Sequence, residues 1–219
     1  MTEKPWLGFD SMGIEIAFVV MLVIGLAVMF WMIVRSSSLK IVKQYEKLAH
    51  KLRIKLTKPE PQLFGFIRPE PFVHGIYRDR AMSISVPGKG LQNTRQIETT
   101  LKVELTDKKI KWQMTAKGLL SGMRQRDSVG MERWQSDNNV FDLSVDVRTN
   151  EGARLTRILH DDRLMQISKV LKGSKSSIYL GEGMMVYTKF GLIANEIERE
   201  RFEKVVELFC DLSEVLEGR

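Results

Sequence analysis

One segment restricts what this chain can fold into more than any other: nineteen consecutive residues without a charge, from Ile16 to Val34. A helix of that length spans about 28 Å, close to the ~30 Å thickness of bilayer hydrocarbon. The run is apolar on every side, whereas a helix of a soluble domain keeps a polar stripe for solvent. It is also longer than the apolar stretch of a cleavable signal peptide. The sequence therefore predicts a transmembrane helix over residues 14–34.

Most of the positive charge near this helix follows its C-terminal end. Residues 1–13 contain Lys4 as their single basic side chain. Lys and Arg residues within about 20 residues of a membrane helix determine its orientation, because the flank that is richer in them stays on the cytoplasmic side. Six of them follow the apolar run at this range: Arg35, Lys40, Lys43, Lys47, Lys51 and Arg53. We therefore expect a short extracytoplasmic tail over residues 1–13, and a cytoplasmic C-terminal domain at the inner (plasma) membrane.

Residues 35–58 are predicted to form a basic juxtamembrane helix. Eight Lys or Arg residues and one acid give this segment a charge of +7, equal to the formal charge of the whole protein. Anionic lipid head groups attract each basic residue near the membrane by ~1 kcal/mol, so lipid contact is one interpretation. The other is that these residues only set orientation and solvate a linking helix. The expected lipid-contacting side chains are Arg35, Lys40, Lys43, Lys47 and Lys51.

The same distribution of charge argues against a nucleic-acid partner. The pI near 9.5 reflects charge beside the membrane, and no recognised nucleic-acid-binding motif accompanies it. The expected partners are instead the membrane itself, with its anionic head groups, and proteins of a membrane complex.

Beyond a proline-rich connector over residues 59–72, the pattern of apolar residues changes twice. Alternation predicts strands first, and helical spacing then predicts helices over residues 151–172 and 195–216. This order predicts one α+β domain over residues 73–219, with an antiparallel sheet packed by C-terminal helices. The expected strands are 73–77, 81–86, 95–105, 110–114, 141–147, 177–180 and 184–190.

The last helix is predicted to begin at Asn195, because Asn195 and Glu198 have the spacing of a helix-capping pair. Its acidic residues step round one face by threes and fours, away from the apolar stripe. A solvated surface is one interpretation, and a docking face for a basic partner is the other, including the basic segment of a neighbouring copy. The residues of this face are Glu196, Glu200, Glu203, Glu207, Asp211 and Glu214.

No catalytic residue, metal ligand or cofactor site is predicted. The three histidines, His50, His74 and His160, lack further ligands at metal-binding spacing. The glycine-rich pieces do not match a phosphate-binding loop, and the single Cys210 excludes an internal disulfide. Carboxylates that meet only in the folded chain are invisible in a sequence, so a membrane-bound enzyme of unrecognised type stays an alternative.

The layout resembles that of uncharacterised bacterial single-pass membrane proteins with a cytoplasmic α+β domain. The resemblance is carried chiefly by the hairpin GEGMMVYTKFGLI and the acidic helix after it, and it implies no activity and no site residues. We expect a membrane-anchored, non-catalytic accessory or assembly subunit that presents a protein-binding domain to a larger membrane complex. The alternative is a lipid- or ligand-responsive regulatory module at the inner leaflet.

Overall fold

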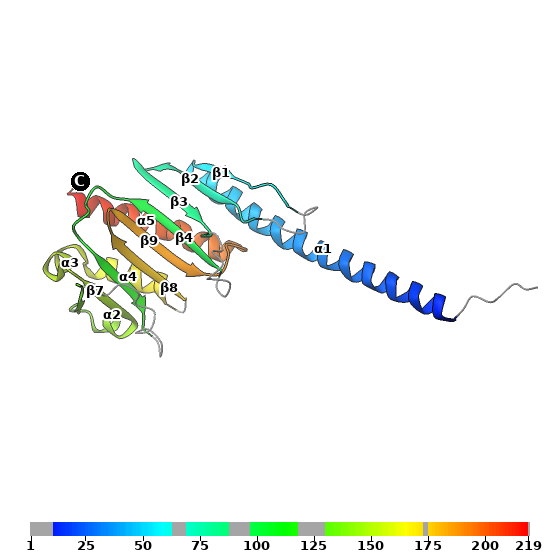
Figure 1. Ribbon diagram of the computed structural model, residues 1–219. Helices are drawn as coiled ribbons and strands as arrows, with labels where there is room; N and C mark the ends of the chain where they lie inside the picture. The colour runs from blue at the N-terminus through cyan, green and yellow to red at the C-terminus, as the bar shows by residue number, and fades with distance from the viewer. Residues whose placement is uncertain (1–10, 63–68, 88–96, 118–129, 173–174, 219) are drawn as a thin grey trace, which may run out of the picture.

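The computed structural model describes residues 11–62, 69–87, 97–117, 130–172 and 175–218. A long helix projects from an α+β domain, and the described strands form one antiparallel sheet in the order β1-β2-β3-β4-β9-β8-β5-β7-β6 (Figure 1). The predicted fold class is confirmed. The strands are β1 (Lys55–Thr57), β2 (Phe72–Tyr77), β3 (Arg80–Ser85), β4 (Glu98–Glu104), β5 (Trp112–Ala116), β6 (Glu132–Trp134), β7 (Val145–Thr149), β8 (Ser176–Gly181) and β9 (Met184–Phe190). The helices are α1 (Ser11–Leu52), α2 (Asn139–Ser144), α3 (Gly152–Ile158), α4 (Asp161–Leu171) and α5 (Glu196–Glu217).

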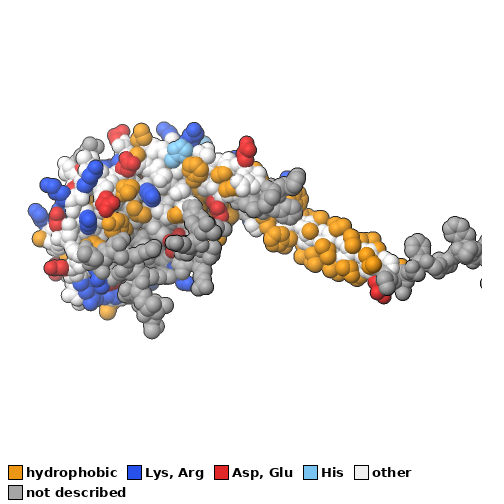
Figure 2. Space-filling view, in the orientation of Figure 1, with side chains coloured by type: hydrophobic (Ala, Val, Ile, Leu, Met, Phe, Trp, Pro, Cys, Tyr) orange, Lys and Arg blue, Asp and Glu red, His pale blue; other side chains and the backbone are white. Residues whose placement is uncertain are grey.

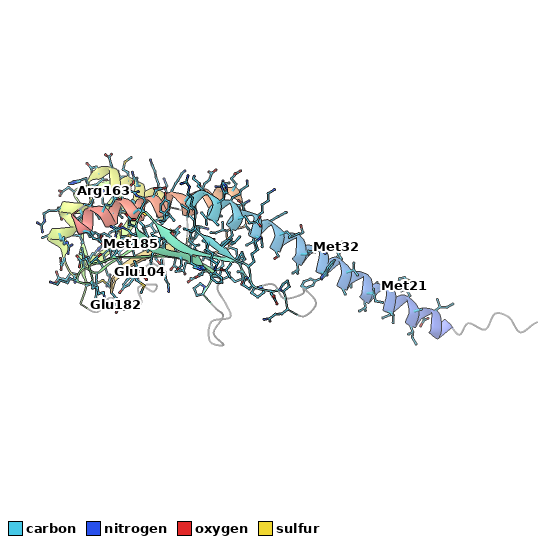
Figure 3. The ribbon with its side chains drawn as sticks, turned by 90° about the horizontal axis from the view of Figure 1, so that it is seen from above. Met21, Met32, Glu104, Arg163, Glu182 and Met185 are labelled. Carbon is cyan, nitrogen blue, oxygen red and sulfur yellow. The ribbon has the colours of Figure 1, made fainter. Side chains whose placement is uncertain are left out.

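The apolar run and the basic segment as far as Leu52 form one continuous helix, α1. Every described side chain from residue 13 to residue 30 is exposed, and this part of the helix is long and apolar enough to cross a membrane. Figure 2 shows its hydrophobic side chains along the projecting rod, and Figure 3 shows Met21 and Met32 well away from the domain. The apolar surface that the domain leaves uncovered is thus concentrated on the segment predicted to lie in lipid.

The other end of α1 belongs to the core of the domain. Tyr45 and Leu48 are fully buried and Leu52 is 2% exposed. Burying one leucine side chain stabilises a fold by about 1.5–3 kcal/mol, so these contacts hold the helix firmly against the domain. The helix ends at Leu52, before the predicted limit of residue 58, because Arg53 has a positive φ of 52° and Lys55–Thr57 pair with β2.

Helices cover one face of the sheet. In Figure 3, α4 and α5 lie on one side of the strands, together with the domain end of α1. The strands turn apolar side chains toward them, and Ile84, Leu101 and Tyr187 are fully buried. Helix α5 begins as predicted, since the Asn195 side chain accepts a hydrogen bond of 2.9 Å from the Glu198 N–H.

The strand predicted over residues 141–147 is half wrong. Its first residues belong to α2, which begins because the Asn138 side chain accepts hydrogen bonds from the N–H groups of Val140 and Phe141. Leu143, whose position in the alternation suggested a core residue, is 78% exposed. Side-chain capping of the backbone outweighs the alternating pattern here, and β7 starts only at Val145.

Candidate functional site

The six acidic residues predicted as a docking face lie along α5, and we call them the acidic row. Each has a cationic neighbour within the chain. Arg199, on α5 itself, pairs with Glu196 at 2.9 Å, with Glu200 at 3.6 Å and with Glu203. The remaining cations come from α1 and from the β2–β3 turn. The row therefore links α5 to two other elements of the domain.

Two lysines of the basic segment point at the acidic row. Lys51 Nζ lies 2.6 Å from the Glu203 carboxylate, and Lys47 Nζ lies 3.8 Å from Glu196. The Lys47 pair is exposed on both sides, so it contributes little, about 0–1 kcal/mol. The Glu203 side chain is only 6% exposed and pairs with both Lys51 and Arg199. Glu203 is therefore the structurally important residue of the acidic row. The basic segment and the acidic row thus meet within one chain, a pairing that the sequence analysis did not predict.

The β2–β3 turn supplies the fourth cation of the acidic row, Arg78. Arg78 and Asp79 have φ of 48° and 60°, as a tight two-residue hairpin turn requires. The Arg78 guanidinium lies 3.3 Å from Glu207, 2.8 Å from Asp211 and 2.6 Å from Glu214. Beside it, the Tyr77 hydroxyl donates a 2.6 Å hydrogen bond to Glu207, and this bond raises the pKa of Tyr77 to about 12.

A separate ion pair holds the C-terminal end of α5. Arg80 donates a 2.7 Å hydrogen bond to Glu217, and the two side chains are 6% and 8% exposed. The Thr106 N–H donates to the other carboxylate oxygen at 2.7 Å. Chiefly because of Arg80, the pKa of Glu217 falls from the usual 4.5 to about 2. Sequence reasoning missed Arg78 and Arg80 as partners of α5, since their positions in a hairpin signalled only a turn.

The five predicted lipid-contacting residues separate into two groups. Arg35 lies over the Trp31 ring at 5.0 Å, and with Lys40 and Lys43 it borders a shallow hollow of about 370 Å³ that also contains Met32 and Leu39. Along a straight helix Arg35, Lys40 and Lys43 lie about 1.5, 9 and 14 Å beyond Val34, so in a bilayer that holds the apolar run Arg35 is at the head groups, Lys40 is at their outer edge and Lys43 is beyond them. Lys47 and Lys51 lie farther out, about 20–25 Å along the helix, against the acidic row.

The described residues show little that resembles reactive chemistry. Among them, no group of three or more His, Cys, Asp or Glu side chains could hold a metal ion. His160 stands at the start of α4, and the His74 ring stacks on Phe72 with centroids 5.6 Å apart. Cys210 is buried, and burial raises the pKa of its thiol to about 11, away from the thiolate form.

A second hollow, of about 490 Å³, lies between α4 and α5. Neither this hollow nor the one on α1 is lined by a carboxylate from residues 98–162. Between β5 and α2, residues 118–129 lie outside the described residues, and Glu132–Trp134 form β6.

Comparison with known proteins supports the fold alone. No family model and no curated protein matches the chain. Among solved structures, the fold is similar to the crystal structure of the mycobacterial trehalose monomycolate transport factor A, TtfA. The TM-score is 0.52 at 10% sequence identity, over 78% of this chain and 92% of that one. At that identity the likeness establishes an α+β architecture in common and carries no residue-level correspondence.

Proposed function

We propose that the chain is a membrane-anchored, non-catalytic accessory subunit, which presents its α+β domain to partners in a larger membrane complex. The observation that carries the proposal is the continuity of α1, whose apolar half projects from the domain and whose polar half ends in the core. A single helix without a flexible linker holds a domain at one height and in one orientation. Such a restriction suits a protein that must meet a neighbour in the same membrane.

Two further facts support this proposal. The excess of Lys and Arg after the apolar run favours a cytoplasmic domain at the inner membrane. The structurally similar TtfA is called a transport factor, which is compatible with an accessory role in a membrane process.

The docking role predicted for the acidic row stays a prediction. The row already braces α5 against α1 and the β2–β3 turn, so a basic partner would have to displace Arg78 or Lys51.

Extraction in several mild detergents at native expression level tests the proposal. We expect one or more membrane proteins to co-purify with the chain in a fixed stoichiometry, before and after size-exclusion chromatography. The control is an unrelated single-pass protein with a similar apolar run. A solitary, monodisperse chain in every detergent would refute the accessory role.

A lipid-responsive regulatory module is the second candidate. It is favoured by the hollow on α1, where Arg35, Lys40 and Lys43 stand next to Met32 and Leu39 at the end of the apolar run. Native mass spectrometry of the full chain should then show retained phosphatidylglycerol in preference to phosphatidylcholine. Replacing the three basic residues by Gln should remove that preference, whereas Gln at positions 47 and 51 should leave it. Equal retention of both lipids would refute this candidate.

A further inference from the structure

The connection between β1 and β2 is far longer than the pairing of these strands requires. Thr57 and Phe72 lie opposite each other in the sheet, yet residues 58–71 separate them along the chain. Hairpin loops usually have about two to five residues, and much longer connections are uncommon inside a compact domain. The structure describes residues 58–62 and 69–71 of this connection, and residues 63–68 lie outside the described part. The length of the connection is therefore to be explained by what it contacts.

Both ends of this connection lie beside α1. At its start, Lys58 Nζ lies 2.5 Å from the Glu46 carboxylate. At its end, Glu70 lies close enough to Tyr45 to act on its hydroxyl: burial, and in addition the negative charge of Glu70, raise the pKa of Tyr45 to about 12. In Figure 1 the described residues that follow β1 run beside α1 in the direction of the apolar run. The connection therefore leaves α1 and returns to it at one level of the helix.

One stripe of α1 between this level and the apolar run is partly covered. Val34, Ser38 and Ile41 are each half-buried, and with the buried Tyr45 they follow the spacing i, i+4, i+7 and i+11 of one helix face. Every described side chain from residue 13 to residue 30 of the same helix is exposed, and so are the side chains that border the hollow of α1. The stripe is therefore a contact surface that the helix alone does not account for.

The connection is long enough to cover this stripe. Its midpoint, residue 64, is six residues from Lys58 and six from Glu70. Six extended residues span about 20 Å, and the prolines of the connection favour extended chain. Tyr45 lies about 16–17 Å beyond Val34 along α1. A connection that folds back at its midpoint therefore reaches Val34, at the border of the bilayer hydrocarbon.

The composition of residues 63–68 suits the same place. Their sequence is LFGFIR, with four large apolar side chains in succession but for one glycine. Soluble surfaces rarely expose apolar groups at this density, so such a run needs an apolar surface to contact. At the level of Val34 both the stripe of α1 and the border of the hydrocarbon are available. The charged head of Arg68 can extend from there to the lipid head groups, because its stem is long.

We propose that residues 63–68 pack on the stripe of Val34, Ser38 and Ile41, where α1 leaves the bilayer, and that their outward side chains enter the hydrocarbon border as a second membrane contact. A domain on one helix is free to tilt toward any side of that helix. A second contact on one side of α1 selects a single direction of tilt, so the same face of the domain is always turned to the membrane. The inference depends on α1 spanning the bilayer and goes beyond the accessory function.

Disulfide trapping in the full chain, held in phosphatidylcholine nanodiscs, tests the contact with α1. The native Cys210 is 1% exposed and stays in place. Under mild oxidation, Ser38→Cys combined with Phe64→Cys or with Phe66→Cys should form an intrachain disulfide. The matched pairs with Ser37→Cys, which is exposed and about 100° round the helix, should form it at least about tenfold more slowly. Equal rates at the two serines, or disulfides formed only between chains, would overturn the docking on α1.

A nitroxide spin label tests the contact with the bilayer in the same nanodiscs. On Phe66→Cys it should collide several times more often with oxygen, which concentrates in hydrocarbon, than with a water-soluble nickel chelate. On Lys109→Cys, an exposed position of the β4–β5 loop, the preference should be the reverse. A label at position 66 that behaves like the one at position 109 would overturn the membrane contact. Neither measurement involves a partner protein, so a negative result here leaves the accessory function standing.

Discussion

The C-terminal end of α5 depends on a carboxylate that must stay ionised. Glu217 is 8% exposed, accepts hydrogen bonds from Arg80 and from the Thr106 N–H, and has a pKa of about 2 against the usual 4.5. The substitution Glu217→Gln keeps the shape and one carbonyl acceptor but removes the charge that Arg80 faces. Arg80 would then be buried without a counterion, which is the costly outcome for a buried pair.

The two pKa values set the size of the effect. A pKa difference of one corresponds to about 1.4 kcal/mol, so the ionised Glu217 contributes on the order of 3 kcal/mol to the free energy of unfolding at pH 7. The folded pKa is the lower one. This contribution is therefore complete above the unfolded value of about 4.5 and is lost as the pH falls toward 2.

Urea unfolding of wild type and Glu217→Gln in a mild detergent, followed by tryptophan fluorescence, measures the difference. We expect Glu217→Gln to lower the free energy of unfolding by about 3 kcal/mol at pH 7, by about 2 kcal/mol at pH 3.5 and by less than about 0.5 kcal/mol at pH 2. Glu214→Gln is the matched control, because Glu214 is 40% exposed and should cost less than about 1 kcal/mol. A Glu217→Gln difference that stays constant between pH 7 and pH 3 would refute the electrostatic explanation.

Two further substitutions test the start of α5 and the continuity of α1. Asn195→Ala should lower the free energy of unfolding by about 1 kcal/mol, because the Glu198 N–H loses its acceptor. Asn195→Asp keeps an acceptor oxygen and should be as stable as the wild type. Equal stabilities of all three proteins would contradict this role of Asn195. Ser37→Pro should kink α1 between membrane and domain, at a cost of about 3 kcal/mol, and reduce partner co-purification while membrane extraction is unchanged. The control is Ser37→Ala, and full co-purification of Ser37→Pro would show that a straight helix is not required.

Local patterns predicted the elements well where one rule acted alone. The alternation in β4, the turn between β8 and β9 and the cap at Asn195 were all visible, because each depends on neighbouring residues. The error at residues 141–147 arose where two local rules competed, and the cap at Asn138 was the stronger.

The candidate site was only partly predictable, for a different reason. The acidic row and the basic segment were both recognised, but their pairing was not, since Lys51 and Glu203 are 152 residues apart. Arg78 meets the row across 129 to 136 residues, and only the packing of α5 on the sheet brings the β2–β3 turn to it. The hollow between α4 and α5 likewise exists only once the two helices are packed.

The unbroken helix between Val34 and Tyr45 has a geometrical consequence for any change in its length. Each added residue raises the domain by about 1.5 Å and turns it by about 100° about the helix axis. A single insertion there would leave the contacts of Tyr45 and later residues intact, yet it would rotate the α4–α5 hollow by about 100° about the helix axis, so that the hollow faces another direction in the membrane plane. Seven added residues would restore the direction to within about 20°, at a height about 10 Å greater. The number of residues in this stretch thus sets the azimuth of the domain as well as its distance from the bilayer.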